Sequence, residues 1–428
     1  MLTVTPISRM RGTVNVPGDK SISHRAVMLG SLAEGTTIIR NFLHSQDCLS
    51  TVKCMQQLGA AVTIKDDGSV QIEGGGLEAL AEPTDVLDAG NSGTTMRLLL
   101  GILATQPFFS VITGDASLRR RPMDRVGEPL KMMGATFLGR NNGKLAPIAV
   151  QGGNLKPISY RTPVASAQLK SSILLAALNT PGQTCVTEPA PSRDHTERML
   201  RYFGASLHKE GLSTYLQGAP RLKGREVVVP GDISSAAFFM VAACIIPDSE
   251  ILIKDVGINP LRTGIIDVLR SMGADITIHH PRTFSGEPVA DIVVRTSSLH
   301  GTKVGGDLIP RLIDEIPVLA VAAAYADGNT IITDAAELKV KESNRIATMA
   351  SELSSIGADV RELDDGLFIK GGQPIQGGIC DSHGDHRIAM SLAIAGLSAS
   401  GPVTIKNSEC IDVSFPGFLE VLKTVSEG

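Results

Sequence analysis

An apolar stretch with helical spacing, closed by the pair Gly-Ala, recurs five times along the chain. The glycines of successive pairs are 75, 70, 69 and 84 residues apart: Gly59, Gly134, Gly204, Gly273 and Gly357. Each glycine stands where the C-terminal cap of a helix requires a positive φ. After four of the five, apolar and polar residues alternate as in a strand, for example in Val62–Ile64. With a sixth stretch at Phe418–Leu422, the pattern predicts a βα-rich unit of about 70 to 80 residues, present about six times.

A longer-range repeat predicts two halves. Val16–Ser21 reads VPGDKS and Val229–Ser234 reads VPGDIS, and each copy opens an apolar helix. Pro-Gly pairs are typical of turns, so we place one domain boundary near Pro17 and another near Pro230. The simplest architecture is a mixed α/β fold with two lobes of three units each.

Composition restricts the partners that this chain could bind. Hydrophobic residues make up 43% of the 428 residues, but aromatic residues only 4%, and the formal net charge is −4. A slightly acidic chain with few stacking side chains is poorly suited to nucleic acid or anionic lipid. The longest apolar run, residues 236–246, is too short to span a bilayer. We therefore expect neither nucleic acid nor a membrane as a partner.

Several familiar sites are missing from the sequence. The six cysteines form no C-x-x-C pair, which argues against a zinc site or a disulfide framework. There is no Walker loop, no dinucleotide fingerprint and no G-x-S-x-G elbow, and His383 and His386 have no evident third metal ligand. The first residues lack the apolar core of a secretory signal. We expect reduced thiols, no metal and a cytoplasmic location.

Four predicted helices begin with basic residues, although lysine and arginine favour the last turn of a helix. These starts are residues 18–25, 192–195, 339–345 and 384–387. A bound anion there would use the free amide groups and relieve the repulsion. For each start alone, a solvated basic face is the alternative, and the starts at Asp19, Asp194 and Asp385 are explained in part by capping. Together they predict a cleft in which helix N-termini from both lobes bind phosphates or carboxylates.

Other residues are candidates for the same cleft. Two uncharged helix starts, residues 91–94 and 166–170, could join it, and Gly93 would let a ligand approach the backbone closely. Arg119–Arg121 is a further basic cluster, which a surface turn would also explain. Asp314 and Glu342 lie among these basic residues. Each could be an exposed structural carboxylate, or could carry protons in an acid–base reaction.

At these positions the sequence resembles the 5-enolpyruvylshikimate-3-phosphate synthases, a family of enolpyruvyl transferases. The resemblance rests on five motifs in the family's order: G-D-K-S-x-S-H-R from Gly18, N-x-G-T from Asn91, R-P-M from Arg121, V-K-E-S-x-R from Val340 and D-H-R from Asp385. It covers essentially the whole chain, to Pro416. It implies an inverted α/β barrel of two lobes, each of three βαβαββ units. Residues 1–17 would join residues 230–428 in one lobe, residues 18–229 would form the other, and the active site would lie in the cleft between them.

The reaction implied by the resemblance transfers the enolpyruvyl group of phosphoenolpyruvate to the 5-hydroxyl of shikimate 3-phosphate, with release of phosphate. By similarity, Asp314 handles the hydroxyl proton, Glu342 handles the methylene proton, and Lys20 bridges both substrates. No cofactor is implied, and we expect a monomer acting on two small molecules. The shikimate 3-phosphate contacts would be Lys20, Ser21, Arg25, Ser166, Ala167, Gln168, Arg193, Asp314 and Lys341. The phosphoenolpyruvate contacts would be Lys20, Gly93, Arg121, Gln168, Arg345 and Arg387.

The chain departs from the family pattern in places. Many members carry a lysine just before the position of Ser414, where this chain has Val413, so one phosphoenolpyruvate contact is absent or replaced. The motifs Ser166-Ala-Gln-x-Lys170 and Arg193-x-His-x-Glu197 resemble a bacterial subgroup that tolerates the herbicide glyphosate. Tolerant members often have alanine where this chain has Gly93, so we predict intermediate sensitivity.

Two other functions are alternatives. A sister enzyme that acts on UDP-N-acetylglucosamine typically carries a reactive cysteine in the loop that matches residues 113–122, where this chain has none. A non-catalytic sensor of phosphorylated metabolites would bind its ligand without releasing phosphate. Such a sensor could dispense with Asp314, Glu342 and Lys20.

Overall fold

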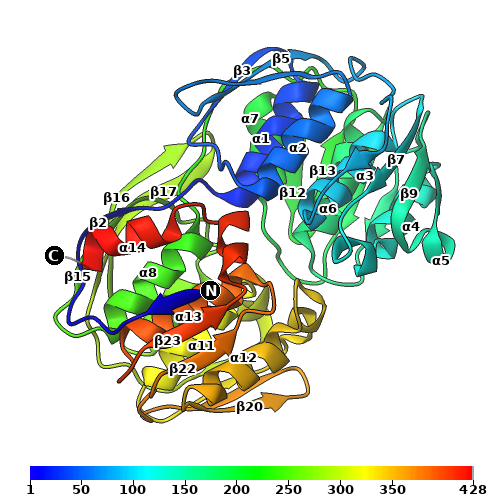
Figure 1. The fold of residues 1–428 in the computed structure, drawn as a ribbon. Helices are drawn as coiled ribbons and strands as arrows, with labels where there is room; N and C mark the ends of the chain where they lie inside the picture. The colour runs from blue at the N-terminus through cyan, green and yellow to red at the C-terminus, as the bar shows by residue number, and fades with distance from the viewer. Residues whose placement is uncertain (427–428) are drawn as a thin grey trace. The chain divides into compact units, whose positions relative to one another are not determined.

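The computed structural model describes residues 1–426, which form two compact units, each with a hydrophobic core of its own (Figure 1). Unit 1 contains Met1–Pro17, Pro230–Thr283 and the chain from Pro288 onward, and unit 2 contains Gly18–Val229 and Phe284–Glu287. Residues 284–287 are the last residue of β16 (Asp275–Phe284), a two-residue turn and the first residue of β17 (Glu287–Arg295). Their place in unit 2 is a detail that no sequence motif indicates.

The described part of unit 2 forms three four-stranded sheets of the same design. Their strand orders are β14-β3-β5-β4, β6-β7-β9-β8 and β10-β11-β13-β12. In each sheet the first pair is parallel and the other two pairs are antiparallel. The strands are β3 (Glu34–Arg40), β4 (Ala61–Ile64), β5 (Val70–Gly75), β6 (Leu87–Asp88), β7 (Phe109–Thr113), β8 (Thr136–Gly139), β9 (Leu145–Gln151), β10 (Ser159–Arg161), β11 (Gln183–Thr187), β12 (Leu207–Glu210), β13 (Ser213–Gln217) and β14 (Glu226–Val228).

Three sheets also form the described part of unit 1, ordered β16-β17-β15-β2, β18-β19-β21-β20 and β1-β23-β22. In the last sheet, β1 pairs antiparallel with β23, so a strand from the N-terminal end of the chain lies in the same sheet as the strands near the C-terminal end. The strands are β1 (Leu2–Val4), β2 (Arg11–Asn15), β15 (Glu250–Gly257), β16 (Asp275–Phe284), β17 (Glu287–Arg295), β18 (Lys303–Val304), β19 (Asn329–Ile332), β20 (Asp359–Leu363), β21 (Gly366–Lys370), β22 (Gly378–Asp381) and β23 (Val403–Lys406).

Helices fill the interior of each unit. In unit 1, α8, α11 and α13 pack against one another (Figure 1) and are buried almost all round, as expected for helices that are apolar on every face. The helices of unit 2 are α1 (Lys20–Leu32), α2 (Gln46–Gln57), α3 (Gly93–Leu103), α4 (Asp124–Met133), α5 (Arg140–Gly143), α6 (Ala167–Leu178) and α7 (His195–Phe203). Those of unit 1 are α8 (Ile233–Ile245), α9 (Gly264–Ser271), α10 (Ile309–Leu312), α11 (Ile316–Tyr325), α12 (Arg345–Ser355), α13 (His386–Leu397) and α14 (Phe418–Ser426).

The predicted repeat is confirmed by the glycines that close its helices. Their φ angles are +87°, +116°, +104°, +99° and +102° for Gly59, Gly134, Gly204, Gly273 and Gly357. A strand follows all five glycines rather than four: β4, β8, β12, β16 and β20. Six sheets within residues 1–426 agree with six units, and the mixed α/β fold class is confirmed.

The central pair of helices in unit 2, α3 and α6, packs closely. A Cβ on Gly101 of α3 would collide with the backbone oxygen of Ser172 in α6. The glycine therefore permits the short distance between the helices that position Gly93 and Gln168 at their N-terminal ends.

Candidate active site

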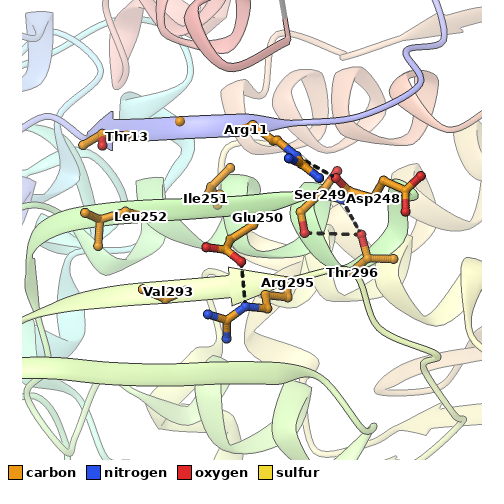
Figure 2. A pocket seen from close by; sticks show the side chains of 11 residues that line it. Arg11, Thr13, Asp248, Ser249, Glu250, Ile251, Leu252, Val293, Arg295 and Thr296 are labelled. Carbon is orange, nitrogen blue, oxygen red and sulfur yellow. Dashed lines mark hydrogen bonds and ion pairs between the residues drawn. The ribbon is translucent and has the colours of Figure 1, made fainter. Parts of the chain in front are cut away.

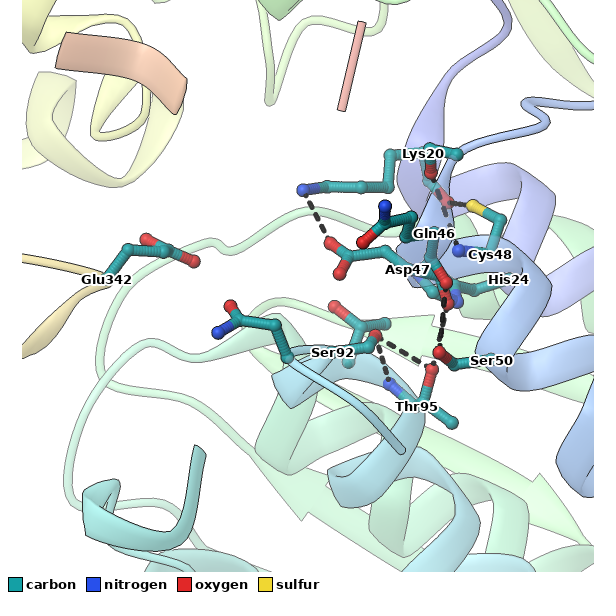
Figure 3. A network of polar contacts seen from close by, with 12 residues as sticks. Lys20, His24, Gln46, Asp47, Cys48, Ser50, Ser92, Thr95 and Glu342 are labelled. Carbon is teal, nitrogen blue, oxygen red and sulfur yellow. Dashed lines mark hydrogen bonds and ion pairs between the residues drawn. The ribbon is translucent and has the colours of Figure 1, made fainter. Parts of the chain in front are cut away.

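In unit 2, the first two turns of α1 carry three of the predicted site residues. The Asp19 carboxylate accepts a hydrogen bond from the backbone N–H of Ile22 at 2.9 Å, so it caps the helix as expected. The Lys20 Nζ lies 3.0 Å from Oδ2 of Asp47 in α2 (Figure 3). The lysine side chain is 19% exposed, so it is held in place but can still be reached by a ligand.

Arg25 is buried where α1 meets α6 and α7. Its Nε donates to Thr196 Oγ1 at 2.6 Å, its Nη2 to Ser171 Oγ at 2.8 Å, and its Nη1 to the Ser21 backbone oxygen at 2.9 Å. The pKa of Arg25 is lowered to about 10, chiefly by burial and in part by the charge of Arg193, while the Glu197 carboxylate acts in the opposite direction. Arg25 and Arg193, two predicted contacts of shikimate 3-phosphate, are therefore electrostatic neighbours.

The start of α3 brings a second group together. Ser92 caps the helix by accepting from the Thr95 backbone N–H at 3.1 Å (Figure 3). A Cβ on Gly93 would lie 3.1 Å from Arg97 Nη1 and 3.5 Å from Arg121 Nη1. Gly93 is thus buried between two guanidinium groups, and it adds no side chain of its own to the space beside them.

Gln168 joins this group from the start of α6. Its Oε1 accepts from Arg97 Nη1 at 2.7 Å, and its Nε2 donates to Thr94 Oγ1 at 3.1 Å. Ser166 is the N-cap residue of α6 and accepts from the Leu169 backbone N–H at 3.4 Å, and Ala167 is the first helical residue. The neighbouring helix starts of α3 and α6 therefore present a glycine, an amide and a guanidinium close together.

In unit 1, the predicted residues gather around one arginine. Arg345 Nη2 lies 2.6 Å from Glu342 Oε2, and Arg345 Nη1 lies 3.4 Å from Asp314 Oδ1. Lys341 Nζ lies 3.6 Å from the same Asp314 oxygen. Arg387 Nη1 donates to the Asp314 backbone oxygen at 3.0 Å. All five predicted residues of unit 1 thus form a single cluster of two carboxylates and three cations.

Asp385, which the sequence indicated only as a helix cap, also anchors this cluster. Its carboxylate accepts from Arg345 Nε at 2.8 Å and Nη2 at 3.3 Å, and caps α13 through the Arg387 backbone N–H at 3.0 Å. Burial would raise the pKa of Asp385, but the charge of Arg345 more than offsets it and the pKa lies below its ordinary value. Burial would likewise lower the pKa of Arg345, and the carboxylates of Asp385 and Glu342 raise it above the usual range.

Two local expectations are wrong. The Asp194 side chain makes no cap bond to α7; its carboxylate accepts instead from Arg198 Nε at 2.8 Å, because the arginine one turn later competes for it. Lys341 and Glu342 do not lie within a helix, because Asn344 caps α12 and the helix begins only at Arg345. Both side chains therefore project from an irregular segment that precedes the helix.

The sequence motifs did not single out Arg97, which contacts Gln168, or Glu188, which pairs with Lys170 of the motif that begins at Ser166. Arg97 lies one helical turn after Gly93, and this i, i+4 spacing on a predicted helix could have indicated that the two residues share one face. Glu188 and Lys170 are paired at 2.6 Å below the start of α6. Glu188 lies in a segment without any motif, so no sequence signal connected it to Lys170.

A hollow elsewhere on unit 1 has no relation to these residues. It lies over β2, β15 and β17, and its charged side chains pair locally: Arg295 Nε with Glu250 Oε2 at 2.8 Å, and Arg11 Nε with the Asp248 backbone oxygen at 3.3 Å (Figure 2). No predicted site residue lines it. We assign it no function.

Other classes of site were sought among residues 1–426. No three His, Cys, Asp or Glu side chains are grouped so that they could hold a metal ion, and His383 pairs with Glu352 at 3.1 Å. The six cysteines are free thiols. None of the helices described is long and apolar enough to cross a membrane.

Comparison with known proteins identifies the family. Residues 4–422 match the model of EPSP synthase (3-phosphoshikimate 1-carboxyvinyltransferase). The protein of that name from Desulforudis audaxviator is 62% identical over 99% of both chains. The one from Pelotomaculum thermopropionicum is 61% identical over 97% of this chain and 96% of the relative. The structure of EPSP synthase from Acinetobacter baumannii superposes with a TM-score of 0.89 at 47% identity, covering 99% of this chain and 97% of that one. The enolpyruvyl transferase NikO from Streptomyces tendae, 18% identical with a TM-score of 0.79 over 99% of this chain and 96% of that one, shares the fold. The chain belongs to the EPSP synthase family, and it is an enzyme of the transferase class.

Proposed function

We propose that this chain transfers the enolpyruvyl group of phosphoenolpyruvate to the 5-hydroxyl of shikimate 3-phosphate and releases phosphate. The observation that carries the proposal is the cluster of unit 1, in which Asp314 and Glu342 share the cation Arg345 at 3.4 and 2.6 Å. The reaction needs one group to accept a proton and another to donate one while it binds two polyanions. Two carboxylates among three cations meet both requirements.

The residues can be assigned to steps. In the addition step the hydroxyl oxygen bonds to C2 of phosphoenolpyruvate, Asp314 accepts the hydroxyl proton, and Glu342 donates a proton to the methylene carbon. In the elimination step the bond from C2 to the phosphate oxygen breaks, the leaving phosphate takes the proton held by Asp314, and the methyl group returns a proton to Glu342. The double bond forms again, so that atoms and charge balance without a cofactor.

Unit 2 supplies the groups that suit the anionic ends of the substrates. We assign shikimate 3-phosphate to Ser21, Arg25, Ser166, Ala167, Gln168 and Arg193, together with Asp314 and Lys341 of unit 1. We assign phosphoenolpyruvate to Gly93, Arg121 and Gln168, together with Arg345 and Arg387 of unit 1, and Lys20 to both substrates. Because neither unit holds both sets of residues, we propose that the two units bind the substrates jointly.

The proton carriers can be tested by isosteric substitution. Asp314→Asn and Glu342→Gln remove the ionisable groups and keep the side-chain size. Each should lower kcat about 100-fold or more, whereas Asp364→Asn, at an exposed position of the same unit, should leave it unchanged. Phosphate release, followed by a coupled colorimetric assay, is the measurement. Activity of both site variants within threefold of the unmodified chain would refute the assignment.

We further propose that the chain acts as a monomer in the cytoplasm. Each unit has its own core, and six free thiols suit a reducing compartment. Sedimentation velocity at micromolar concentration should give a single species of about 45 kDa, the mass of one chain. A dimer at that concentration would contradict the proposal.

A further inference from the structure

A buried ionic cluster lies beneath the start of α6 in unit 2. The Lys170 side chain is fully buried; its Nζ lies 2.6 Å from Glu188 Oε2 and 2.8 Å from Glu197 Oε1. The two carboxylates are also almost fully buried, at 3% and 2% exposure. None of the three residues has a role in the reaction proposed above.

Stability alone does not account for this cluster. Removing charges from water is expensive, and well-packed apolar side chains of similar volume are often as stabilising as a buried ion pair. The cluster also holds two carboxylates for one ammonium group, which leaves one negative charge in excess. Glu197 acts to keep Arg25 charged, while Arg193 acts against it. The Glu197 carboxylate therefore offsets part of the positive charge that Arg25 and Arg193 bring to this region.

The cluster also holds the backbone beside Arg193. Ser192 Oγ donates to Glu188 Oε1 at 2.5 Å, and Lys170 Nζ donates to the Ser192 backbone oxygen at 3.5 Å. Ser192 is 4% exposed and directly precedes Arg193. Its position is thus fixed from both its side chain and its carbonyl.

A second network, of hydroxyl groups, lies one residue after Lys170 in α6 and one residue before Glu197 in α7. Ser171, next to Lys170, and Thr196, next to Glu197, are hydrogen-bonded to each other at 2.6 Å and both accept from Arg25. The two networks together connect α1, α6 and α7. The hydroxyl network accepts hydrogen bonds from Arg25. The ionic network is hydrogen-bonded to Ser192, the residue before Arg193.

We propose that Lys170, Glu188 and Glu197 are positioning residues, which act through Ser192 to fix the backbone that carries Arg193 before substrate binds. The proposal rests on the proposed function, because it takes the phosphate of shikimate 3-phosphate as the ligand of Arg25 and Arg193. A site that is already ordered loses less conformational entropy on binding. Disconnecting the cluster should therefore weaken shikimate 3-phosphate binding and leave the chemical step unaffected.

The test uses two small changes that keep the ion pair of Lys170 with Glu197. Ser192→Ala removes the hydroxyl link, and Glu188→Gln neutralises the carboxylate that accepts it. The matched control is Ser31→Ala, also a buried serine of unit 2, whose hydroxyl donates only to the Val27 backbone oxygen of its own helix at 2.8 Å. Calorimetry gives the Kd of shikimate 3-phosphate, steady-state kinetics give kcat and the KM of phosphoenolpyruvate, and thermal unfolding gives Tm.

Both site variants should raise the Kd of shikimate 3-phosphate about tenfold, which corresponds to one lost hydrogen bond to a charged group. Their kcat and the KM of phosphoenolpyruvate should stay within about twofold, and the control should bind like the unmodified chain. A lower Tm with an unchanged Kd in both variants would overturn the inference and leave the proposed function intact. If the unmodified chain neither binds shikimate 3-phosphate nor releases phosphate, the proposed function fails and the inference fails with it.

Discussion

The variant Asp385→Asn tests how the cluster of unit 1 is held together. The Asp385 side chain is fully buried. Its Oδ1 accepts the cap bond from the Arg387 backbone N–H and a 3.3 Å bond from Arg345 Nη2, and its Oδ2 accepts the 2.8 Å bond from Arg345 Nε. Asparagine with its oxygen at the Oδ1 position keeps the cap, since it caps helices as well as aspartate does. Its amide group replaces Oδ2 and faces the Arg345 Nε–H as well as the Ser343 hydroxyl, which donates to Oδ2 at 3.1 Å but can rotate to accept instead.

The magnitude follows from the bonds that change. Hydrogen bonds to charged groups contribute about 1.5–3 kcal/mol each, and here one is lost and the other becomes weaker. We expect a loss of about 3 kcal/mol in the free energy of unfolding, comparable to breaking a buried ion pair from one side. Arg345 would then be balanced by Asp314 and Glu342 alone. A shift of its guanidinium by about 1 Å should cost about 100-fold in kcat/KM for phosphoenolpyruvate.

Urea unfolding followed by circular dichroism measures the first effect, and initial rates measure the second. The matched control is Asp381→Asn, because this carboxylate of the same unit accepts from the His383 backbone N–H at 2.8 Å and from Asn407 Nδ2 at 2.7 Å but contacts no residue of the cluster. Both bonds go to Oδ1, which asparagine retains, so the control should cost less than about 1 kcal/mol, with kcat/KM unchanged. If Asp385→Asn costs no more than the control and keeps its kcat/KM, Arg345 does not depend on Asp385 and our reasoning is wrong.

Three further predictions follow from single contacts. Because the folded-state pKa of Asp385 is depressed, its stabilising effect is present above the unfolded value of about 3.9 and is lost as pH falls through the folded pKa. The difference in stability between the unmodified chain and Asp385→Asn should therefore be constant from about pH 5 to 8 and shrink in stronger acid. Urea midpoints that differ equally at every pH would contradict this. Gly93→Ala should fold normally, since its Cβ would meet only the movable ends of Arg97 and Arg121 at 3.1 and 3.5 Å. It should raise the inhibition constant of glyphosate and the KM of phosphoenolpyruvate several-fold. Unchanged inhibition would place the inhibitor elsewhere. Gly101→Ala should lower stability by about 1–3 kcal/mol through overpacking of α3 on α6, and an unchanged Tm in calorimetry would show that the two helices can separate without cost.

The repeat could be predicted because each unit ends its helix with a glycine that must adopt positive φ. Gly59 and its four counterparts mark positions where a local rule decides the conformation. The last unit behaves differently because β1, from the other end of the chain, pairs with β23. No local pattern contains that information, since strand pairing over such a separation depends on tertiary packing.

The candidate site was predictable where a residue's type alone suggests anion binding or proton transfer, as for Arg25 and Glu342. The supporting residues were not, because their roles arise from contacts across the fold. Glu188 and Lys170 meet only when β11 and α6 are packed. Asp194 seemed to be a cap from its position alone, but Arg198 was a stronger partner for its carboxylate. Residues 284–287 join unit 2 through Glu287, whose carboxylate lies 2.8 Å from His195 Nδ1, a pairing between distant segments.

The most direct measurement of the central claim is phosphate release from phosphoenolpyruvate with and without shikimate 3-phosphate. We predict that phosphate appears only when both compounds are present, in a one-to-one ratio with the enolpyruvyl product. Replacing shikimate 3-phosphate by UDP-N-acetylglucosamine should abolish the release. Tight binding of shikimate 3-phosphate without any phosphate release would contradict the account and indicate a sensor that has kept the site but does not catalyse the reaction.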